Sequence, residues 1–402
     1  MQNKSLLILY VVFLFWGIIF CMNDILLPYL RNSFVLSYFQ ASMIQFVFFG
    51  AYLIISIPAG KAIARVGYKK GIIIGLTVAG IGCLIFFPAA HFKVYGIFLF
   101  ALFVLSSGIA MLQAAVNPLV VALGSPAFAA SRLNLAQAIS KLGYAVAPLI
   151  GNFFLFRGTV DATNSDASLV KTPYLILAVI FFLLGAFVYS FSFPKISVAN
   201  QPFLESLRLL RKHKQLMLGV VGIFMYVGAE ITTNAFFINF LSDSSVAGIS
   251  LSAAAQYLSQ YWTFATITGF VGFIVLKYIH PGRLLTICAI ISVMLLLVSM
   301  MSSGATAVVS MVGLGGFISI LFPTIFALAL EDLGSMTNQG SAVLLTAVVG
   351  GALIPPVQGW ISDAFNIRIS FIVPCLCYLY IAYYGFWVSM IRRKINHKKT
   401  NI

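Results

Sequence analysis

Long apolar runs separated by short polar stretches fill this chain. The runs fall at about 6–29, 40–60, 71–90, 95–122, 133–155, 172–193, 216–241, 253–276, 284–302, 304–329, 341–361 and 369–391. A helix needs about 20 apolar residues to cross a bilayer, whereas membrane β-barrels show only weak alternation. The pattern predicts an all-α membrane protein with twelve transmembrane helices. The first run is too long for a signal peptide, so we expect it to be retained.

Composition agrees with a lipid-embedded protein. Of the 402 residues, 61% are hydrophobic and only 8% are charged, whereas a soluble protein carries about 25% charged residues. This difference excludes a soluble enzyme, a nucleic-acid-binding domain and a disordered tail. The five cysteines all lie in apolar runs, so neither a disulfide framework nor a zinc site is expected.

Lysine and arginine predict the orientation in the membrane. If the N-terminus lies inside, 18 of the 24 basic residues fall in inner segments, and only Lys141 lies within a span. Inner segments of membrane proteins are enriched in these residues. We therefore expect both termini in the cytoplasm. The net charge of +15 then reflects topology, with the lipid bilayer rather than a nucleic acid as the partner.

The longest polar stretch, 194–215, divides six runs from six. It contains four apolar residues at helical spacing beside basic residues: Phe203, Leu204, Leu207 and Leu210. This spacing predicts a short amphipathic helix on the inner membrane surface, and a flexible linker is the alternative. We therefore expect an N-terminal half at 1–193, a cytoplasmic linker, and a C-terminal half with a basic tail at 216–402.

The two halves resemble each other. Asn117-Pro118 and later Pro148 in the first half match Phe322-Pro323 and Pro356 in the second, at offsets of 205 and 208 residues. Asp24 and Glu230 match at an offset of 206. Internal repeats of this kind are typical of transporters whose two halves alternate access to a central site.

Three ionisable residues lie well inside the predicted spans: Asp24, Lys141 and Glu230. Each costs about 2.5–3.5 kcal/mol at a helix centre, so such residues usually face a wet cavity or one another. Asp24 is either a protonatable carboxylate beside a substrate cavity or a helix end near the outer surface. Lys141 either pairs with Asp24 or Glu230, donates to sugar hydroxyls, or binds an acidic substrate.

Amide side chains recur on the same faces of several runs. They are Gln113 and Asn117, Asn134 and Gln137, Asn234 beside Glu230, Gln256 and Gln260, and Gln358. Amides donate to and accept from hydroxyls, and neighbouring aromatic faces cover the apolar side of a sugar ring. A polar, sugar-binding cavity is predicted, although single amides can instead bond neighbouring helices.

Several segments resemble a known family. Gly60, Arg65 and Gly67, followed by two lysines, resemble the loop signature of the major facilitator superfamily, with Ala64 in place of the usual aspartate. Longer runs resemble its fucose–galactose–glucose/proton symporter family. They include "LQAAVNPLVVALG" (112–124), "RLNLAQ" (132–137), "FPTIFALALEDLG" (322–334) and "GGALIPPVQGWISD" (350–363). Gln113 replaces the glutamate of fucose carriers, which favours the glucose/galactose branch.

The resemblance implies proton-coupled uptake of a monosaccharide by a monomer in the bacterial inner membrane, with no cofactor besides the coupling proton. It links proton coupling to Asp24 and matches Glu230 to a family glutamate, so we assign proton coupling to both. We also expect Lys141 to lie close enough to Asp24 to tune its proton affinity. The resemblance adds Asn23 to the substrate-binding residues and makes Gly60, Arg65 and Gly67 gating residues. Ser140-Lys141 departs from the family's Asn-Ser.

Three other functions remain as alternatives. Lys141 as a fixed cation fits an uncoupled sugar facilitator or a carrier of a modified or acidic sugar. A drug or metabolite exporter is suggested by a partial resemblance of the segment from Gly143 to Gly151 to an antiporter motif. A membrane enzyme is not expected, because the four histidines lie in loops, span ends or the tail and form no metal-binding cluster.

Overall fold

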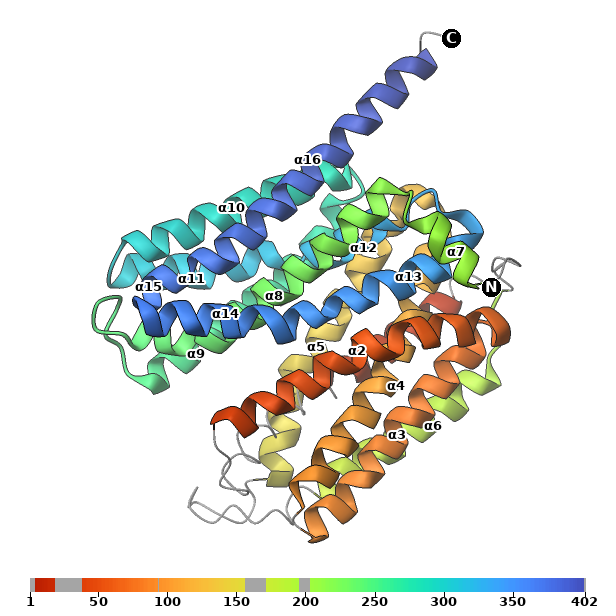
Figure 1. Ribbon diagram of the computed structural model, residues 1–402, viewed down its shortest axis with the longest axis horizontal. Helices are drawn as coiled ribbons and strands as arrows, with labels where there is room; N and C mark the ends of the chain where they lie inside the picture. The colour runs from red at the N-terminus through yellow and green to blue at the C-terminus, as the bar shows by residue number, and fades with distance from the viewer. Residues whose placement is uncertain (1–3, 19–37, 93, 156–170, 195–202, 401–402) are drawn as a thin grey trace. The chain divides into compact units, whose positions relative to one another are not determined.

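The computed structural model describes residues 4–18, 38–92, 94–155, 171–194 and 203–400, which form helices and turns without a strand (Figure 1). Within these residues, ten helical segments are long and apolar enough to cross a membrane. Seven are single helices: α2 (Tyr38–Val66), α3 (Tyr68–Phe92), α4 (Tyr95–Ala122), α6 (Lys171–Ser190), α8 (Lys214–Ser242), α9 (Leu251–Val275) and α10 (Pro281–Met301).

The other three spans are each built from two helices. These pairs are α11 (Ala305–Ile318) with α12 (Leu321–Ala329), α13 (Thr337–Thr346) with α14 (Gly350–Ala364), and α15 (Ile367–Ser370) with α16 (Ile372–Thr400). The helix Lys4–Ile18 and α5 (Ala129–Leu155) occupy the two remaining predicted runs. A helix therefore lies at each of the twelve apolar runs.

The break between α11 and α12 has a local cause. Pro323 has no N–H group, so it cannot donate to the carbonyl of Ser319, and its ring crowds that carbonyl. The chain leaves regular helix at Ser319 and Ile320 and resumes at Leu321. A 3₁₀ turn, η4 (Ala347–Val349), separates α13 from α14. The sequence pattern predicted one continuous helix at each of these places.

The chain divides into two compact units. Unit 1 comprises residues 1–124, 139–206 and 334–346, and unit 2 comprises 125–138, 207–333 and 347–402. Unit 2 thus contains the start of α5, whose remainder belongs to unit 1, and unit 1 contains α13, whose span continues as α14 in unit 2. The predicted division at the 194–215 linker stays a prediction. Within that linker the structure contains a short helix, α7 (Phe203–Leu210).

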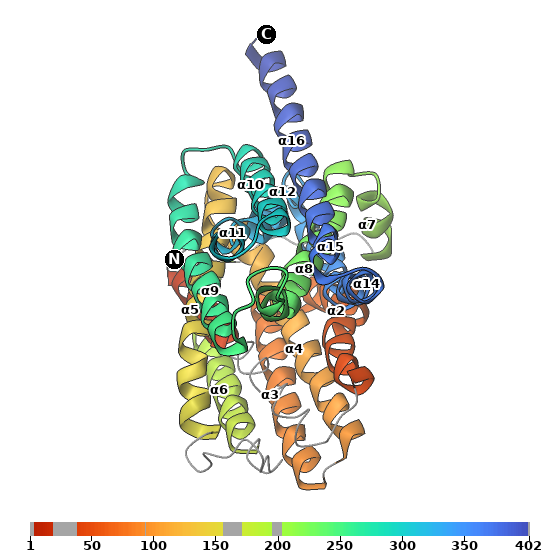
Figure 2. The same cartoon turned by 90° about the vertical axis from the view of Figure 1, so that its left-hand side faces the viewer.

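In unit 1, α3 packs along α4 and α6, and α2 packs on α4 (Figure 2). Glycine allows the close approach of α3 and α4: a Cβ atom on Gly108 would lie 2.3 Å from the backbone nitrogen of Ala79. Small residues serve this purpose in membranes, where van der Waals contact replaces the hydrophobic effect between helices. Phe86 and Tyr174 stack between α3 and α6 with ring centroids 3.7 Å apart.

In unit 2, α8 is the central element and packs against α9, α12, α14 and α16. A Cβ atom on Gly350 would lie 2.1 Å from the carbonyl oxygen of Phe224, so α14 begins against the backbone of α8. α10 packs against α11 and α16. This arrangement leaves α8 enclosed by helices that can satisfy its polar side chains.

The internal repeat of the sequence is also visible in the backbone conformation. Gly124 and Gly334 both adopt positive φ angles, 96° and 54°, which L-residues with side chains rarely adopt. A 3₁₀ turn is associated with each glycine: η1 (Pro126–Phe128) comes after Gly124, and η3 (Gly334–Met336) starts at Gly334. α5 and α13 then begin, 208 residues apart. These two turns introduce the two segments exchanged between the units.

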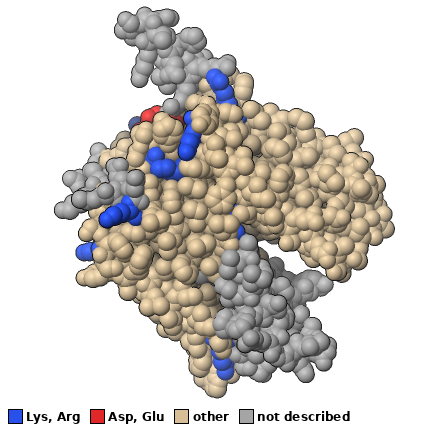
Figure 3. Space-filling view, turned by 180° about the vertical axis from the view of Figure 1, so that it is seen from behind, with Lys and Arg blue, Asp and Glu red and all other residues tan. Residues whose placement is uncertain are grey.

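The surface is mainly uncharged. Figure 3 shows a broad face of uncharged residues, with lysine and arginine confined to small patches. Large apolar side chains such as Leu183 and Val309 are 64% and 69% exposed. In water such exposure would be unusual over so wide an area, whereas in a bilayer the same side chains contact lipid.

We expect Gly350→Ala to destabilise the protein by about 1–3 kcal/mol, because its methyl group would overlap the Phe224 carbonyl and overpack the contact. Gly359→Ala on the same helix is the matched control, since its Cβ would lie 3.6 Å from Phe236, an ordinary contact. Thermal unfolding of the purified variants measures the difference. Equal melting temperatures for the two variants would contradict the close approach of α8 and α14.

Candidate functional site

Glu230 on α8 is held by a tyrosine one turn earlier. The hydroxyl of Tyr226 donates to Oε1 of Glu230 at 2.7 Å. Tyr226 is buried, and Glu230 is half-buried. Tyr261 on α9 and Tyr378 on α16 are fully buried and close enough to interact electrostatically with Glu230. The carboxyl group therefore lies among phenol groups from three helices.

Asn234, one turn after Glu230, is bound to α9. The indole Nε1 of Trp262 donates to Oδ1 of Asn234 at 3.1 Å. The rings of Tyr261 and Trp262 meet edge to face, with centroids 5.4 Å apart. Carboxylate, amide and aromatic groups thus lie together along one stretch of α8 and α9. This combination suits a polyhydroxyl ligand with an apolar ring face.

The other predicted amides of unit 2 differ in their surroundings. Gln358 is fully buried; its Oε1 accepts from Thr232 at 2.8 Å, and its Nε2 donates to Ser370 at 3.3 Å. It therefore ties α14 to α8 and α15. Gln256 and Gln260 are exposed on α9.

In unit 1, Gln113 and Asn117 lie one turn apart on α4. The Gln113 Nε2 donates to the hydroxyl of Tyr52 on α2 at 2.9 Å. Asn117 is 0% exposed, and neither of its amide atoms has a hydrogen-bond partner among the described residues. Buried polar groups are normally hydrogen-bonded, so Asn117 has the capacity to bind a polar group that the described chain does not supply.

The polar stripe of α5 spans both units. Asn134 in unit 2 donates from Nδ2 to the carbonyl of Gly269 on α9 at 2.6 Å. Gln137 is half-buried, and its Nε2 has no partner within the described part of the chain. The Lys141 ammonium nitrogen, in unit 1, is buried. Asn23 and Asp24 lie outside the described residues.

The predicted gating residues lie in the last turns of α2 and directly after it. Arg65 is exposed in the last turn, and Gly67 (φ 83°) separates α2 from α3. The carbonyl of Gly60 accepts a hydrogen bond from Nδ2 of Asn338 on α13 at 2.7 Å. Asn338 is fully buried, so this bond fixes α13 to α2 within unit 1.

Sequence reasoning missed several residues of this arrangement. Tyr226, Tyr261, Tyr378 and Tyr52 were not predicted as polar partners, because tyrosine in an apolar run looks like packing. Asn338 and Gln339 carried a detectable signal, since two adjacent amides stand at the start of an apolar run. Gln339 is also fully buried, and neither amide atom has a partner among the described residues. Over those residues, no three metal-binding side chains gather.

Comparisons with known proteins place this geometry in context. The family model described as "Major Facilitator Superfamily" matches residues 6–348. A curated "Glucose/galactose transporter" of Brucella abortus is 46% identical over 93% of this chain and 91% of its own length. A "Putative glucose/galactose transporter" of Helicobacter pylori is 39% identical over 93% of this chain and 94% of its own length.

A symporter and its structure are also similar. The "L-fucose-proton symporter" of Escherichia coli is 31% identical over 94% of this chain and 93% of its own. The crystal structure of FucP, a Major Facilitator Superfamily transporter in the outward conformation, matches with a TM-score of 0.89 at 30% identity. That match covers 96% of this chain and 99% of FucP. The similarity therefore extends over almost the whole chain.

Removing the two amide side chains of α4 should have different effects on the stability of the protein. We expect Asn117→Leu to leave the melting temperature unchanged or raise it, because it replaces a buried amide that lacks partners with an apolar group of similar size. Gln113→Leu should destabilise by about 1–3 kcal/mol, because it leaves the buried Tyr52 hydroxyl unpaired. Thermal unfolding compares the two. A larger loss for Asn117→Leu would show that Asn117 supports the fold.

Proposed function

Because the chain belongs to the major facilitator superfamily, we propose that it takes up a monosaccharide together with a proton by alternating access. Its curated relatives are transporters, so the reaction is movement of a solute rather than an enzymatic conversion. The observation that carries the proposal is the cluster on α8, where Tyr226 holds Glu230 and Trp262 holds Asn234. Glucose and galactose are the substrates that the similar proteins suggest.

A monosaccharide suits the chemistry of this cluster. Glu230 accepts hydrogen bonds from hydroxyl groups, and the amide of Asn234 retains its Nδ2 donor, because the bond from Trp262 uses only Oδ1. The aromatic face of Trp262, which is half-buried, can cover the C–H side of a pyranose ring.

Proton coupling is proposed for Asp24, with Lys141 tuning its affinity. A carboxyl group in a low-dielectric site favours the protonated form, and a nearby cation favours the ionised form. If opening and closing change the distance between Asp24 and Lys141, the carboxyl group binds a proton in one state and releases it in the other. The buried ammonium of Lys141 supports this role, as does the name of the E. coli relative, a fucose–proton symporter.

Lys141 also favours an alternative to proton-coupled uptake. A cation held permanently beside Asp24 would keep that carboxylate ionised, and the protein would then be an uncoupled facilitator or would carry an acidic sugar.

We also propose that the protein lies in the bacterial inner membrane as a monomer with both termini in the cytoplasm. The distribution of lysine and arginine supports this orientation.

Coupling is tested by removing the proposed proton site. In proteoliposomes with a proton gradient, Asp24→Asn should abolish accumulation of labelled galactose but retain exchange of internal for external sugar. Asp363→Asn, at an exposed position, is the matched control and should accumulate sugar normally. If Asp24→Asn accumulates sugar like the wild type, Asp24 does not carry the proton.

Binding is tested at the α8 cluster. Tyr226→Phe removes the donor that positions Glu230 and should weaken sugar binding about tenfold, as expected for a hydrogen bond to a charged group. Tyr383→Phe, at a half-exposed position on α16, should bind like the wild type. Isothermal titration with galactose measures both affinities. Unchanged affinity in Tyr226→Phe would remove this cluster from the binding site.

A further inference from the structure

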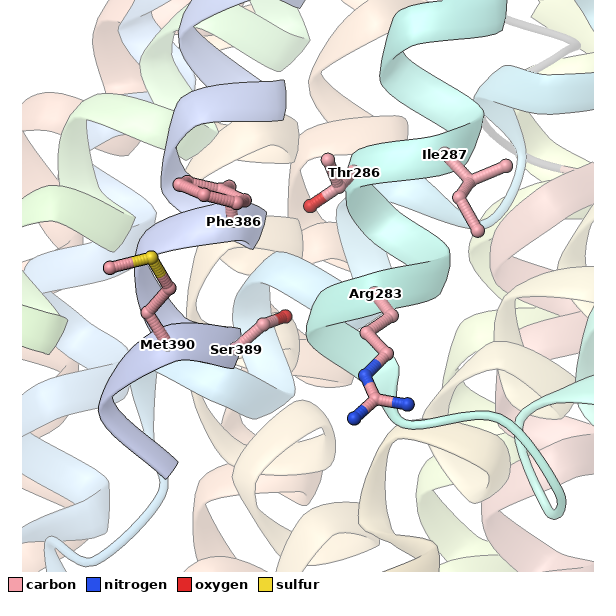
Figure 4. A pocket seen from close by; sticks show the side chains of 6 residues that line it. All are labelled: Arg283, Thr286, Ile287, Phe386, Ser389 and Met390. Atoms are coloured by element: carbon pink, nitrogen blue, oxygen red, sulfur yellow. The ribbon is translucent and has the colours of Figure 1, made fainter. Parts of the chain in front are cut away.

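A groove of about 250 Å³ lies between α10 and α16 in unit 2 (Figure 4). Six residues line it: Arg283, Thr286, Ile287, Phe386, Ser389 and Met390. None of them belongs to the proposed sugar site. Ile287, Phe386 and Met390 are 49%, 54% and 44% exposed, so the groove opens on the outer side of these helices. On a membrane-spanning pair, such a groove faces lipid.

Two glycines create the close crossing beside the groove. A Cβ atom on Gly385 would lie 2.7 Å from the hydroxyl of Thr286 and 2.8 Å from the carbonyl oxygen of Gly282. A Cβ atom on Gly282 would lie 2.7 Å from the Ser389 hydroxyl. Because the backbones of α10 and α16 approach this closely, the longer side chains beside the crossing form the two walls of the groove.

The groove has a charged end. Arg283 lies in the first turn of α10 and is exposed. Figure 4 shows its guanidinium group at the end of the groove near Ser389. The N-terminus of α10 adds a partial positive charge there, and α10 and α16 contain no aspartate or glutamate. An anion at this end would meet a cation, and neither of the two helices that form the groove supplies a competing carboxylate.

Away from Arg283 the groove continues as an apolar track. On α10, Ile290 and Met294 follow Ile287 on the same face and are 40% and 54% exposed. On α16, Tyr383 and Leu379 extend the face of Phe386 in the same direction and are 52% and 49% exposed. From Arg283 to Met294 the helix rises about 16 Å, close to the depth of roughly 15 Å for one leaflet's hydrocarbon.

We propose that this groove binds an anionic glycerophospholipid. Arg283 binds the phosphate group, the hydroxyls of Thr286 and Ser389 lie beside it, and an acyl chain follows the apolar track. In the proposed orientation the start of α10 lies on the cytoplasmic side, so the lipid comes from the inner leaflet. Basic pockets between helices on that side of a membrane suit anionic headgroups. The sequence also places Arg392, Arg393 and Lys394 shortly after Met390.

Native mass spectrometry of the full-length protein tests this site. Wild type is titrated with phosphatidylglycerol and with phosphatidylcholine carrying the same acyl chains. Phosphatidylglycerol should bind about fivefold more tightly, since one basic residue near a membrane surface contributes about that preference. Equal affinities for the two lipids would overturn the proposal.

Three variants test whether Arg283 causes the preference for phosphatidylglycerol. Arg283→Gln should lose the preference for phosphatidylglycerol, and Arg283→Lys should retain most of it. Arg211→Gln, an exposed inner-surface arginine outside the groove, is the matched control and should behave like wild type. A preference that survives in Arg283→Gln, or that is lost equally in Arg211→Gln, would show nonspecific attraction to surface charge and contradict the site.

Chain length and free phosphate separate a lipid from a simple anion. A phosphatidylglycerol with six-carbon chains should bind more weakly than one with sixteen-carbon chains, because it covers less of the apolar track. Inorganic phosphate should not displace the long-chain lipid. Equal binding of both chain lengths, or displacement by phosphate, would overturn the lipid assignment. Because the readout is lipid binding, these outcomes are independent of whether the protein carries a sugar.

Discussion

Lipid cannot donate or accept hydrogen bonds, and this constraint underlies the whole structure. Every backbone polar group within the bilayer must be satisfied by the chain itself, which limits the described spans to helices and their short turns. The same constraint directs polar side chains inward, towards partners on other helices. Asn134 binds the carbonyl of Gly269, and Asn338 binds the carbonyl of Gly60. These amides connect helices that hydrophobic contact alone would not place in register.

The side-chain hydrogen bonds of Asn134 and Asn338 also connect the repeat with the proposed mechanism. Each lies near the start of a helix that follows a glycine with positive φ, Gly124 or Gly334, and each lies in a segment exchanged between the two compact units. Alternating access requires contacts that can break and re-form without leaving costly unpaired groups. A single side-chain bond to a glycine carbonyl meets this requirement better than an extensive apolar interface. The symmetry of the sequence is therefore reflected in the positions of these two bonds, each of which lies within one compact unit.

Much of the architecture could be predicted from the sequence. Twelve apolar runs coincide with helices because bilayer thickness sets their length, and the repeated prolines indicated two related halves. The breaks near Ser319 and Ala347 were not predicted, because apolar content does not reveal backbone hydrogen bonding. Pro323 explains only the first break in retrospect.

The candidate site was harder to predict than the fold. An amide in a span can bind substrate or a neighbouring helix, and the sequence does not distinguish these roles. Gln358 and Asn134 use their amides to tie helices together, whereas Asn117 has no partner within the described residues. The tyrosines around Glu230 come from α8, α9 and α16, far apart in sequence. Their convergence depends on tertiary packing. The roles of Asp24 and Lys141 stay predictions.

Sugar and proton are proposed to cross the membrane together, and one measurement tests this coupling directly. Purified protein is placed in vesicles containing a pH-sensitive dye, with equal pH on both sides, and galactose is added outside. We expect the lumen to acidify as the sugar enters, and vesicles lacking the protein to show no change. Entry of labelled galactose without acidification would contradict proton coupling and favour a facilitator.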